Sequence, residues 1–190
     1  MSFVNNIKDF LGNYFLLKET KSLSRDKAFL NLNEAKTIGI VFDATLKEDF
    51  DLVKKYIVYL KEMKKRVKAI GFFNQKGIPE MAYSKLEYDF FSLKNLTWYN
   101  APDNIYVQNF IEDKYDVLLD LNIKDLFPLR YISSLSKARF KVGKKSERNT
   151  SIFDMMIELD GSKNLKFFMR NVDTYLFIIN KKHDNPLITE

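Results

Sequence analysis

Thr37-Ile-Gly-Ile-Val-Phe-Asp43 is the stretch that decides the fold class of this chain. Such a nearly continuous apolar run, rich in β-branched residues, is typical of a strand that is buried on both faces of a parallel sheet. A helix is expected next, because apolar residues recur at helical spacing over 46–63, and a second apolar run follows at 67–73. A strand, an amphipathic helix and a strand in this order predict a right-handed βαβ unit.

The same alternation continues along the rest of the chain. Strands are expected at 87–93, 115–121, 139–143 and 152–159, and helices at 105–113, at 127–136 and from 165 onward. The pattern predicts an α/β fold, a three-layer sandwich with a mostly parallel, Rossmann-like or flavodoxin-like sheet. We expect the strands that begin at Thr37 and Tyr115 to run in the same direction through its middle. The stretch 139–143 alternates basic and apolar residues, so we expect it at an edge or only half covered.

An amphipathic helix is predicted before this domain, over residues 1–20. Its apolar residues have helical spacing, and its polar face is poor in Lys and Arg. A helix that lies on a membrane surface is usually rich in those cations, so packing on the chain's own domain or on a partner is favoured. The sequence thus divides into the helix 1–20, a single α/β domain 21–180 and a flexible tail 181–190.

The composition excludes several classes of site. The 190 residues include no cysteine and one histidine, His183, which removes disulfides, thiolate chemistry, zinc-thiolate sites and a Ser-His-Asp triad. No run of about 18 apolar residues is present, so a membrane span is not expected. We therefore expect no catalytic residue, no metal and no cofactor. Because the N-terminus lacks the pattern of a secretory signal, we expect a cytoplasmic location.

The net charge of +6 is unevenly distributed. Residues 54–68 carry seven cations and one anion, and residues 136–149 carry six cations and one anion. Clustered cations can attract phosphate groups, although a solvated helix end and a basic surface loop are the simpler explanation. Nucleic acid is disfavoured as a partner, because the basic stretches lack the interleaved aromatic residues on which bases stack.

In a parallel α/β sheet, ligands bind beyond the carboxyl ends of the strands. The residues expected there are Asp43, Thr45, Asn74, Lys76, Asp120, Asn122, Lys144, Lys145 and Arg148. Residues 43–48 contain no glycine, so the backbone cannot approach a pyrophosphate as it does in a dinucleotide site. Asp43 or Thr45 is instead expected to cap the following helix. The loop 143–148 is the best candidate for a phosphate contact, because it follows a strand and carries several cations.

Parts of the chain resemble two known groups of proteins. A family of small uncharacterised α/β proteins from Bacteroidetes-type bacteria has similar residues at 37–45, 68–72, 115–122, 127–130, 136–143 and 153–157. The stretch 115–143 also resembles the N-terminal Rossmann-like half of heptosyltransferase-type glycosyltransferases. In that half, a strand reading Tyr-Asp, an apolar run and Asp is followed by a helix and by a strand that ends in glycine. The first resemblance implies no activity, and the second implies a Rossmann-like fold in a chain too short for the nucleotide-sugar-binding domain.

Two functions follow from the sequence. The first is a non-catalytic domain that forms a homo-oligomer or binds a protein partner, because the N-terminal helix and the aromatic segment 83–106 offer apolar surface. The second is a protein, or a glycosyltransferase-like enzyme remnant, that binds a phosphate-containing small molecule in the crevice at the carboxyl ends of the strands. Lys144, Lys145 and Arg148 would contact the phosphate.

Overall fold

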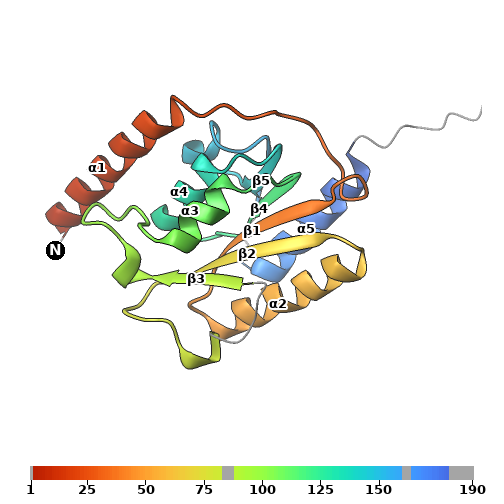
Figure 1. The fold of residues 1–190 in the computed structure, drawn as a ribbon, viewed down its shortest axis with the longest axis horizontal. Coiled ribbons are helices and arrows are strands. Elements are labelled where there is room, and N and C mark those ends of the chain that lie inside the picture. The colour runs from red at the N-terminus through yellow and green to blue at the C-terminus, as the bar shows by residue number, and fades with distance from the viewer. Residues whose placement is uncertain (1, 83–87, 160–163, 180–190) are drawn as a thin grey trace, which may run out of the picture.

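The computed structural model describes residues 2–82, 88–159 and 164–179. Within these residues six strands form one sheet, in which every neighbouring pair is parallel and the order is β3-β2-β1-β4-β5-β6 (Figure 1). The strands are β1 (Thr37–Asp43), β2 (Arg66–Phe73), β3 (Tyr88–Ser92), β4 (Val117–Asp120), β5 (Phe140–Lys144) and β6 (Met155–Ile157). This is the strand order of doubly wound α/β sheets. The expected α/β fold is confirmed, as is the parallel arrangement of β1 and β4.

Helices cover both faces of the sheet. Among the described residues the helices are α1 (Ser2–Thr20), α2 (Lys47–Glu62), α3 (Ile105–Glu112), α4 (Phe127–Leu135) and α5 (Leu165–Ile178). The helices α2 and α5 lie on one face of the sheet, and α3 and α4 lie on the other (Figure 1). Their buried side chains belong to the two core clusters on these faces. The predicted three layers are therefore present. Glu87, the first residue of one predicted strand, lies outside the described residues.

β1 lies at the centre of the sheet and is buried on both sides. Ile38, Ile40 and Phe42 belong to the core cluster of α2 and α5, whereas Val41 belongs to the cluster of α3 and α4. Alternate residues of a strand face opposite sides of a sheet, so a strand that is covered on both sides is apolar throughout. All four side chains are fully buried. Burial of one side chain of this kind stabilises the fold by about 1.5–3 kcal/mol.

β5 differs from its prediction. It lies between β4 and β6 and not at an edge of the sheet, and its Lys141 is only 1% exposed. The expectation of an edge or half-covered strand is therefore wrong. The prediction took Lys141 as an exposed residue because lysine is almost always exposed. A local sequence pattern does not distinguish the rare lysine that is buried.

The connection from β5 to β6 is unusually short for two parallel strands. Such strands are normally joined through a helix, but residues 145–154 contain only one 3-10 turn, Glu147–Asn149. The space beside α4 that a connecting helix would fill is bordered instead by α1 and by residues 21–27, which we call the strap. Figure 1 shows α1 and the chain that follows it running past α4 on this side of the molecule.

α1 packs on α4 through one of its sides. Leu16 lies in a small apolar cluster with Phe127 and Tyr131. A methyl group added to Gly12 would lie 2.6 Å from the carbonyl oxygen of Tyr99, so only glycine allows this close approach. The amphipathic helix expected at 1–20 is thus present, and it forms its own cluster beside the main core.

The remaining expectations concern membranes and the tail. Among the described residues, no helix combines the length and the apolar character that crossing a membrane requires. The cytoplasmic location stays a prediction. The tail expected at 181–190, with His183, lies outside the described residues.

Candidate functional site

The carboxyl ends of β1 and β4 lie side by side at the centre of the sheet. Asp43 ends β1 and Asp120 ends β4, so the structure brings these two predicted residues to one edge. Lys124, from the loop after β4, also reaches this edge, where its Nζ lies 2.7 Å from Oδ2 of Asp43. The ion pair lies at the switch point where doubly wound sheets usually bind their ligands. The sequence did not indicate Lys124, because nothing in the spacing of a loop lysine shows which carboxylate it will meet.

Asp43 and Thr45 hold the chain after β1 and do not cap the following helix. The backbone N–H of Thr45 donates to Oδ1 of Asp43 over 2.9 Å, and that of Asn74 donates to Oγ1 of Thr45 over 2.9 Å. The N-cap residue of α2 is Leu46, which makes no side-chain capping bond, so the expected cap is wrong. The first turn of α2 carries two acidic residues, which suit the positive end of the helix and would repel a phosphate.

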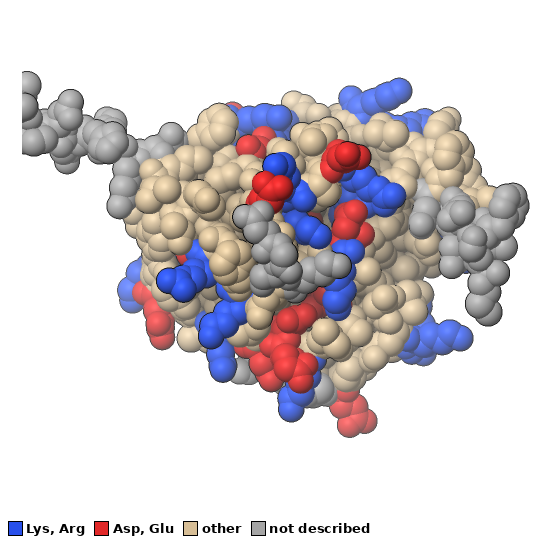
Figure 2. All heavy atoms as spheres, turned by 180° about the vertical axis from the view of Figure 1, so that it is seen from behind, with Lys and Arg blue, Asp and Glu red and all other residues tan. Residues whose placement is uncertain are grey.

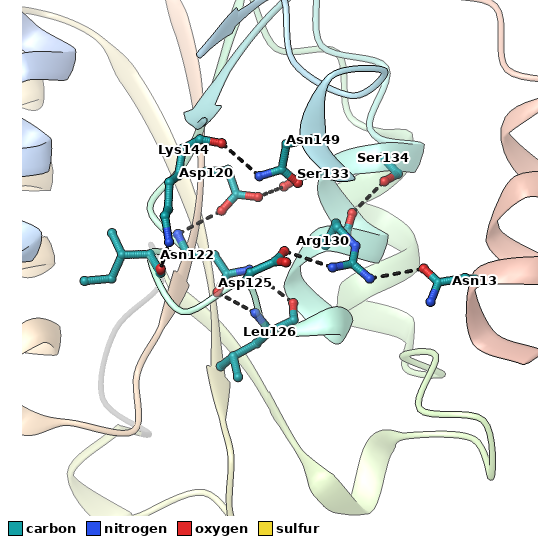
Figure 3. A network of polar contacts seen from close by, with 11 residues as sticks. Asn13, Asp120, Asn122, Asp125, Leu126, Arg130, Ser133, Ser134, Lys144 and Asn149 are labelled. Carbon is teal, nitrogen blue, oxygen red and sulfur yellow. Dashed lines mark hydrogen bonds and ion pairs between the residues drawn. The ribbon is translucent and has the colours of Figure 1, made fainter. Parts of the chain in front are cut away.

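Asp120 is buried within a network of hydrogen bonds (Figure 3). Its Oδ1 accepts from the backbone N–H of Asn122 over 2.8 Å, and its Oδ2 accepts from Oγ of Ser133 over 2.7 Å. Burial raises the pKa of this carboxyl to about 6, although both hydrogen bonds act in the opposite direction. The side chain of Asn122 both donates to and accepts from the backbone of Leu126. These two predicted residues therefore hold the β4–α4 loop in place.

The predicted lysines meet different partners. Nζ of Lys144 donates to the carbonyl oxygen of Ile123 over 2.8 Å, and Lys145 pairs with Glu158 over 2.9 Å at the surface. Lys76 is exposed on the turn after β2. The structure thus directs the amino groups of Lys144 and Lys145 to separate partners, as expected for neighbouring residues at a strand end.

A cavity of about 750 Å³ lies between α1, the strap, α4 and the residues after the β5–β6 turn. It corresponds to the space that a helix between β5 and β6 would fill. The charged side chains among the described residues of its lining are all cationic: Lys21, Arg25, Lys27, Arg130, Lys141 and Arg148. We call this space the basic cavity. Of its six cations, Arg148 alone belongs to the predicted site.

A smaller cavity of about 260 Å³ lies at the carboxyl edge of the sheet. Asn74 lines this smaller cavity, and Asn13, Arg130 and Arg148 line both, so the two cavities adjoin at these three side chains. Arg148 is exposed and, among the described residues, has no hydrogen-bond or ion-pair partner. The predicted residues Asn74 and Arg148 are thus brought to one cavity.

Arg130 lines both cavities, and Figure 3 shows it within the polar network at the start of α4. Its side chain is buried, and its two terminal nitrogens donate to Oδ1 of Asp125 over 2.9 Å and to Oδ1 of Asn13 over 3.1 Å. The guanidinium also lies 5.4 Å from the centre of the Phe127 ring. Arg130 therefore ties α1 to the start of α4 and keeps a positive charge beside both cavities.

Arg25 fastens the strap to the sheet. Its guanidinium donates to the carbonyl oxygen of Ala138 over 2.9 Å and forms an ion pair with Asp154, which lies just before β6. Asp154 also accepts from the backbone N–H of Lys141 over 2.9 Å. Burial raises the pKa of the Asp154 carboxyl, but the hydrogen bonds from Arg25 and Lys141 outweigh burial and leave this pKa below its ordinary value.

Lys141 lies at the inner wall of the basic cavity. Its Nζ donates to the carbonyl oxygens of Ser133 and Ser134, over 2.8 and 3.0 Å, in the last turn of α4. Such carbonyls have no partner inside their own helix, so the lysine satisfies them. Burial lowers the pKa of the Lys141 amine to about 7, and the charges of Arg25 and Lys27 act in the same direction.

The comparisons with known proteins give a family and no activity. A family model described as a family of unknown function (DUF6913) matches residues 8–179. The chain belongs to this family. No curated protein and no solved structure matches the DUF6913 chain. The expected likeness to heptosyltransferase-type glycosyltransferases therefore stays a prediction.

A metal site and a large basic surface are two other ways in which this DUF6913 protein could bind a ligand. Within the described residues, His, Asp and Glu side chains do not gather in a group of three that could hold a metal ion. Figure 2 shows the molecule from behind, where Lys and Arg are interspersed with Asp and Glu. On that face the cations form no continuous basic surface. Another cavity of about 650 Å³ lies beyond the carboxyl ends of β1 and β4, where Lys124 and the predicted Lys144 line it together with the acidic Glu48 and Asp49. The charged side chains that line the basic cavity are all cationic, so it is the better candidate for an anion site.

Proposed function

We propose that the chain binds a small molecule with a phosphate group, and that the basic cavity is its site. The observation that supports this most is the lining, which has six cations and, among the described residues, no carboxylate. A volume of about 750 Å³ falls within the range of small-molecule sites. Cations that surround a concave space focus their field there and attract an anion. The proposal assigns binding and no reaction.

Arg148 is the residue that we expect to contact the phosphate. It is exposed, it lines both cavities, and its guanidinium has no partner among the described residues. A guanidinium can hold a phosphate through two parallel hydrogen bonds. Arg130 has a different role, because its terminal nitrogens already bond to Asp125 and Asn13. It would add positive potential and keep the cavity wall in place.

A thermal-shift screen of nucleotides, sugar phosphates and inorganic polyanions at millimolar concentration tests this proposal. A ligand that binds only the folded chain has to raise the unfolding temperature by mass action. We expect at least one phosphate compound to do so, and we expect Arg148→Glu to remove the shift. Lys166→Glu is the matched control, because Lys166 is exposed on α5, on the other side of the sheet. A screen without any shift would contradict the proposal.

A second candidate function is self-association through α1. Ile7, Phe10, Tyr14 and Leu17 are between 43% and 72% exposed, on the side that does not pack on α4. Their spacing of three, four and three residues is the apolar repeat of a coiled-coil seam. A seam of this kind is complementary to a second copy of itself, so we propose another copy of this chain as its partner.

Light scattering at micromolar concentration tests the self-association. We expect the full chain to form a dimer and the double variant Tyr14→Ser, Leu17→Ser to be a monomer, because burial of the seam provides the stabilising apolar contact. The control is Tyr175→Ser, Ile178→Ser, which removes a similar exposed pair from α5. A wild-type monomer at all concentrations tested would rule out this function.

A further inference from the structure

Lys141 is the buried cation of the basic cavity that, among the described residues, has no ion-pair partner. It is 1% exposed, and two of its three N–H donors are taken by the carbonyl oxygens of Ser133 and Ser134. Among the described residues, no carboxylate lies within ion-pair distance of its Nζ. A buried ammonium without a counter-charge is costly, so burial shifts the equilibrium of Lys141 toward its neutral amine.

The groups around Lys141 strengthen this effect. From the strap, Arg25 and Lys27 repel a positive charge at Lys141. From the segment before β6, Asp154 attracts it, but Asp154 is already paired with Arg25 and lies 3.5 Å from Nζ of Lys27. α4 contributes the two carbonyl acceptors and Arg130, and the β5–β6 turn contributes Arg148. α1 contributes Asn13, Leu16, Leu17 and Thr20 to the lining and no charged side chain.

An anion in this cavity would be the missing counter-charge. We propose that the basic cavity takes up its anion together with one proton, and that Lys141 is the group that holds this proton. This inference rests on the proposed function, because it concerns the same site. The inference adds that the basic cavity selects anionic ligands, and that a rise in pH weakens their binding.

The expected pH dependence follows from linkage. Binding that favours the ammonium form of Lys141 has to weaken as the free chain loses that proton. The pKa of Lys141 is about 7. The dissociation constant should therefore increase about tenfold between pH 6 and pH 8 for an anion whose own charge is constant.

Inorganic sulfate is a suitable probe, because its charge does not change over this range. The full chain would be titrated with sulfate at constant ionic strength, with chloride as the balancing anion, and binding would be followed by the shift in unfolding temperature. We expect wild type to show the tenfold change. Lys141→Arg should bind sulfate with little pH dependence, and Lys141→Met should bind it weakly at every pH. Lys166→Met, on the far side of the sheet, should behave as wild type.

A direct measurement on the wild-type chain keeps the inference testable if the variants do not fold. The side-chain resonances of Lys141 would be followed by NMR against pH, with and without sulfate, and we expect sulfate to raise the pKa of this lysine. Sulfate binding that is independent of pH, or a pH dependence that persists in Lys141→Met, would overturn the inference and leave the proposed function standing. An absence of binding by any anion, at any pH, would overturn both.

Discussion

Nζ of Lys124 lies 2.7 Å from Oδ2 of Asp43, so an ion pair joins the end of β1 to the loop after β4. It lies at the point of the sheet where a ligand was expected from the topology alone. The main cavity lies instead between α1, the strap and α4. The strand order thus identified a position at which a cavity of about 650 Å³ does lie, but its lining carries Glu48 and Asp49 beside Lys124 and Lys144.

This ion pair should add little to stability. Lys124 is 44% exposed, and pairs of this kind contribute at most about 1 kcal/mol. We expect Lys124→Met to change the free energy of unfolding in urea by less than about 1 kcal/mol. A loss several times larger would mean that the pair is needed to close the edge of the sheet.

The pair between Arg25 and Asp154 should matter more, because both side chains are nearly buried. Arg25→Met removes this pair and a hydrogen bond to Ala138, and we expect it to lower the free energy of unfolding by about 2–3 kcal/mol. The pKa of Asp154 lies below its ordinary value of 3.8, so the ion pair stabilises the fold fully at pH values above 3.8. This stabilisation is lost as the pH falls and the carboxyl takes up a proton. The difference between wild type and variant should therefore shrink in acid, as urea unfolding at several pH values can show.

Lys141 should make the free energy of unfolding depend on pH at neutral and alkaline pH. Its pKa is about 7 in the folded chain against 10.5 for an ordinary lysine, so between these values the unfolded chain holds one more proton. Stability then rises with pH by up to about 1.4 kcal/mol per pH unit. Lys141→Met lacks this gain. The free energy of unfolding of wild type minus that of the variant should increase from pH 7 to pH 10, and a constant difference would contradict the depressed pKa.

Asp120 should make the free energy of unfolding fall as the pH rises, in the range from pH 4 to pH 6. Its pKa is about 6 when folded and 3.8 in an ordinary aspartate, so between these values the folded chain holds one more proton. Wild type therefore loses stability as the pH rises from 4 to 6, by about 3 kcal/mol at most. Asp120→Asn keeps an acceptor for Asn122 and has no such loss. The unfolding temperature of Asp120→Asn minus that of wild type should increase from pH 4 to pH 6 and stay constant above pH 6.

Gly12→Ala tests the docking of α1. Alanine favours a helix, but its methyl group would lie 2.6 Å from the carbonyl oxygen of Tyr99, so the helix has to move. We expect a loss of stability of about 1–3 kcal/mol and faster proteolysis within the strap. Lys18→Ala, at an exposed position of the same helix, is the control and should leave both unchanged. Equal proteolysis of Gly12→Ala and wild type would contradict the tight contact.

The sequence alone predicted the strands and helices whose burial follows from the local spacing of their apolar residues. β1 is apolar at nearly every position because both of its faces are covered, and α2 carries one buried stripe because one side packs on the sheet. The expectation for β5 failed because Lys141 is buried through contacts with α4, which a local pattern does not contain. The cap on α2 failed because the side chain of Asp43 turns to Thr45 and Lys124.

The candidate site was only partly predictable. Arg148 and Asn74 could be placed near a cavity, because both follow the carboxyl end of a strand. Arg25 could not, because it meets Asp154 across 129 positions of sequence. The basic cavity is formed where residues 13–27 meet residues 130–152, more than 100 positions apart in the sequence. Spacing within one segment gives no indication of such a meeting.

α1 borders the basic cavity but contributes no residue to the two large core clusters on the faces of the sheet. Among its described side chains, Leu16 packs on Phe127 and Tyr131, and Phe15 contacts the ring of Tyr99. Substitutions at exposed positions of this helix beside the cavity, such as Leu17, can therefore reshape one wall of the cavity at small cost to folding. Under the proposed function, we expect relatives that share the sheet to differ in the molecule that they bind where their residues at these positions differ.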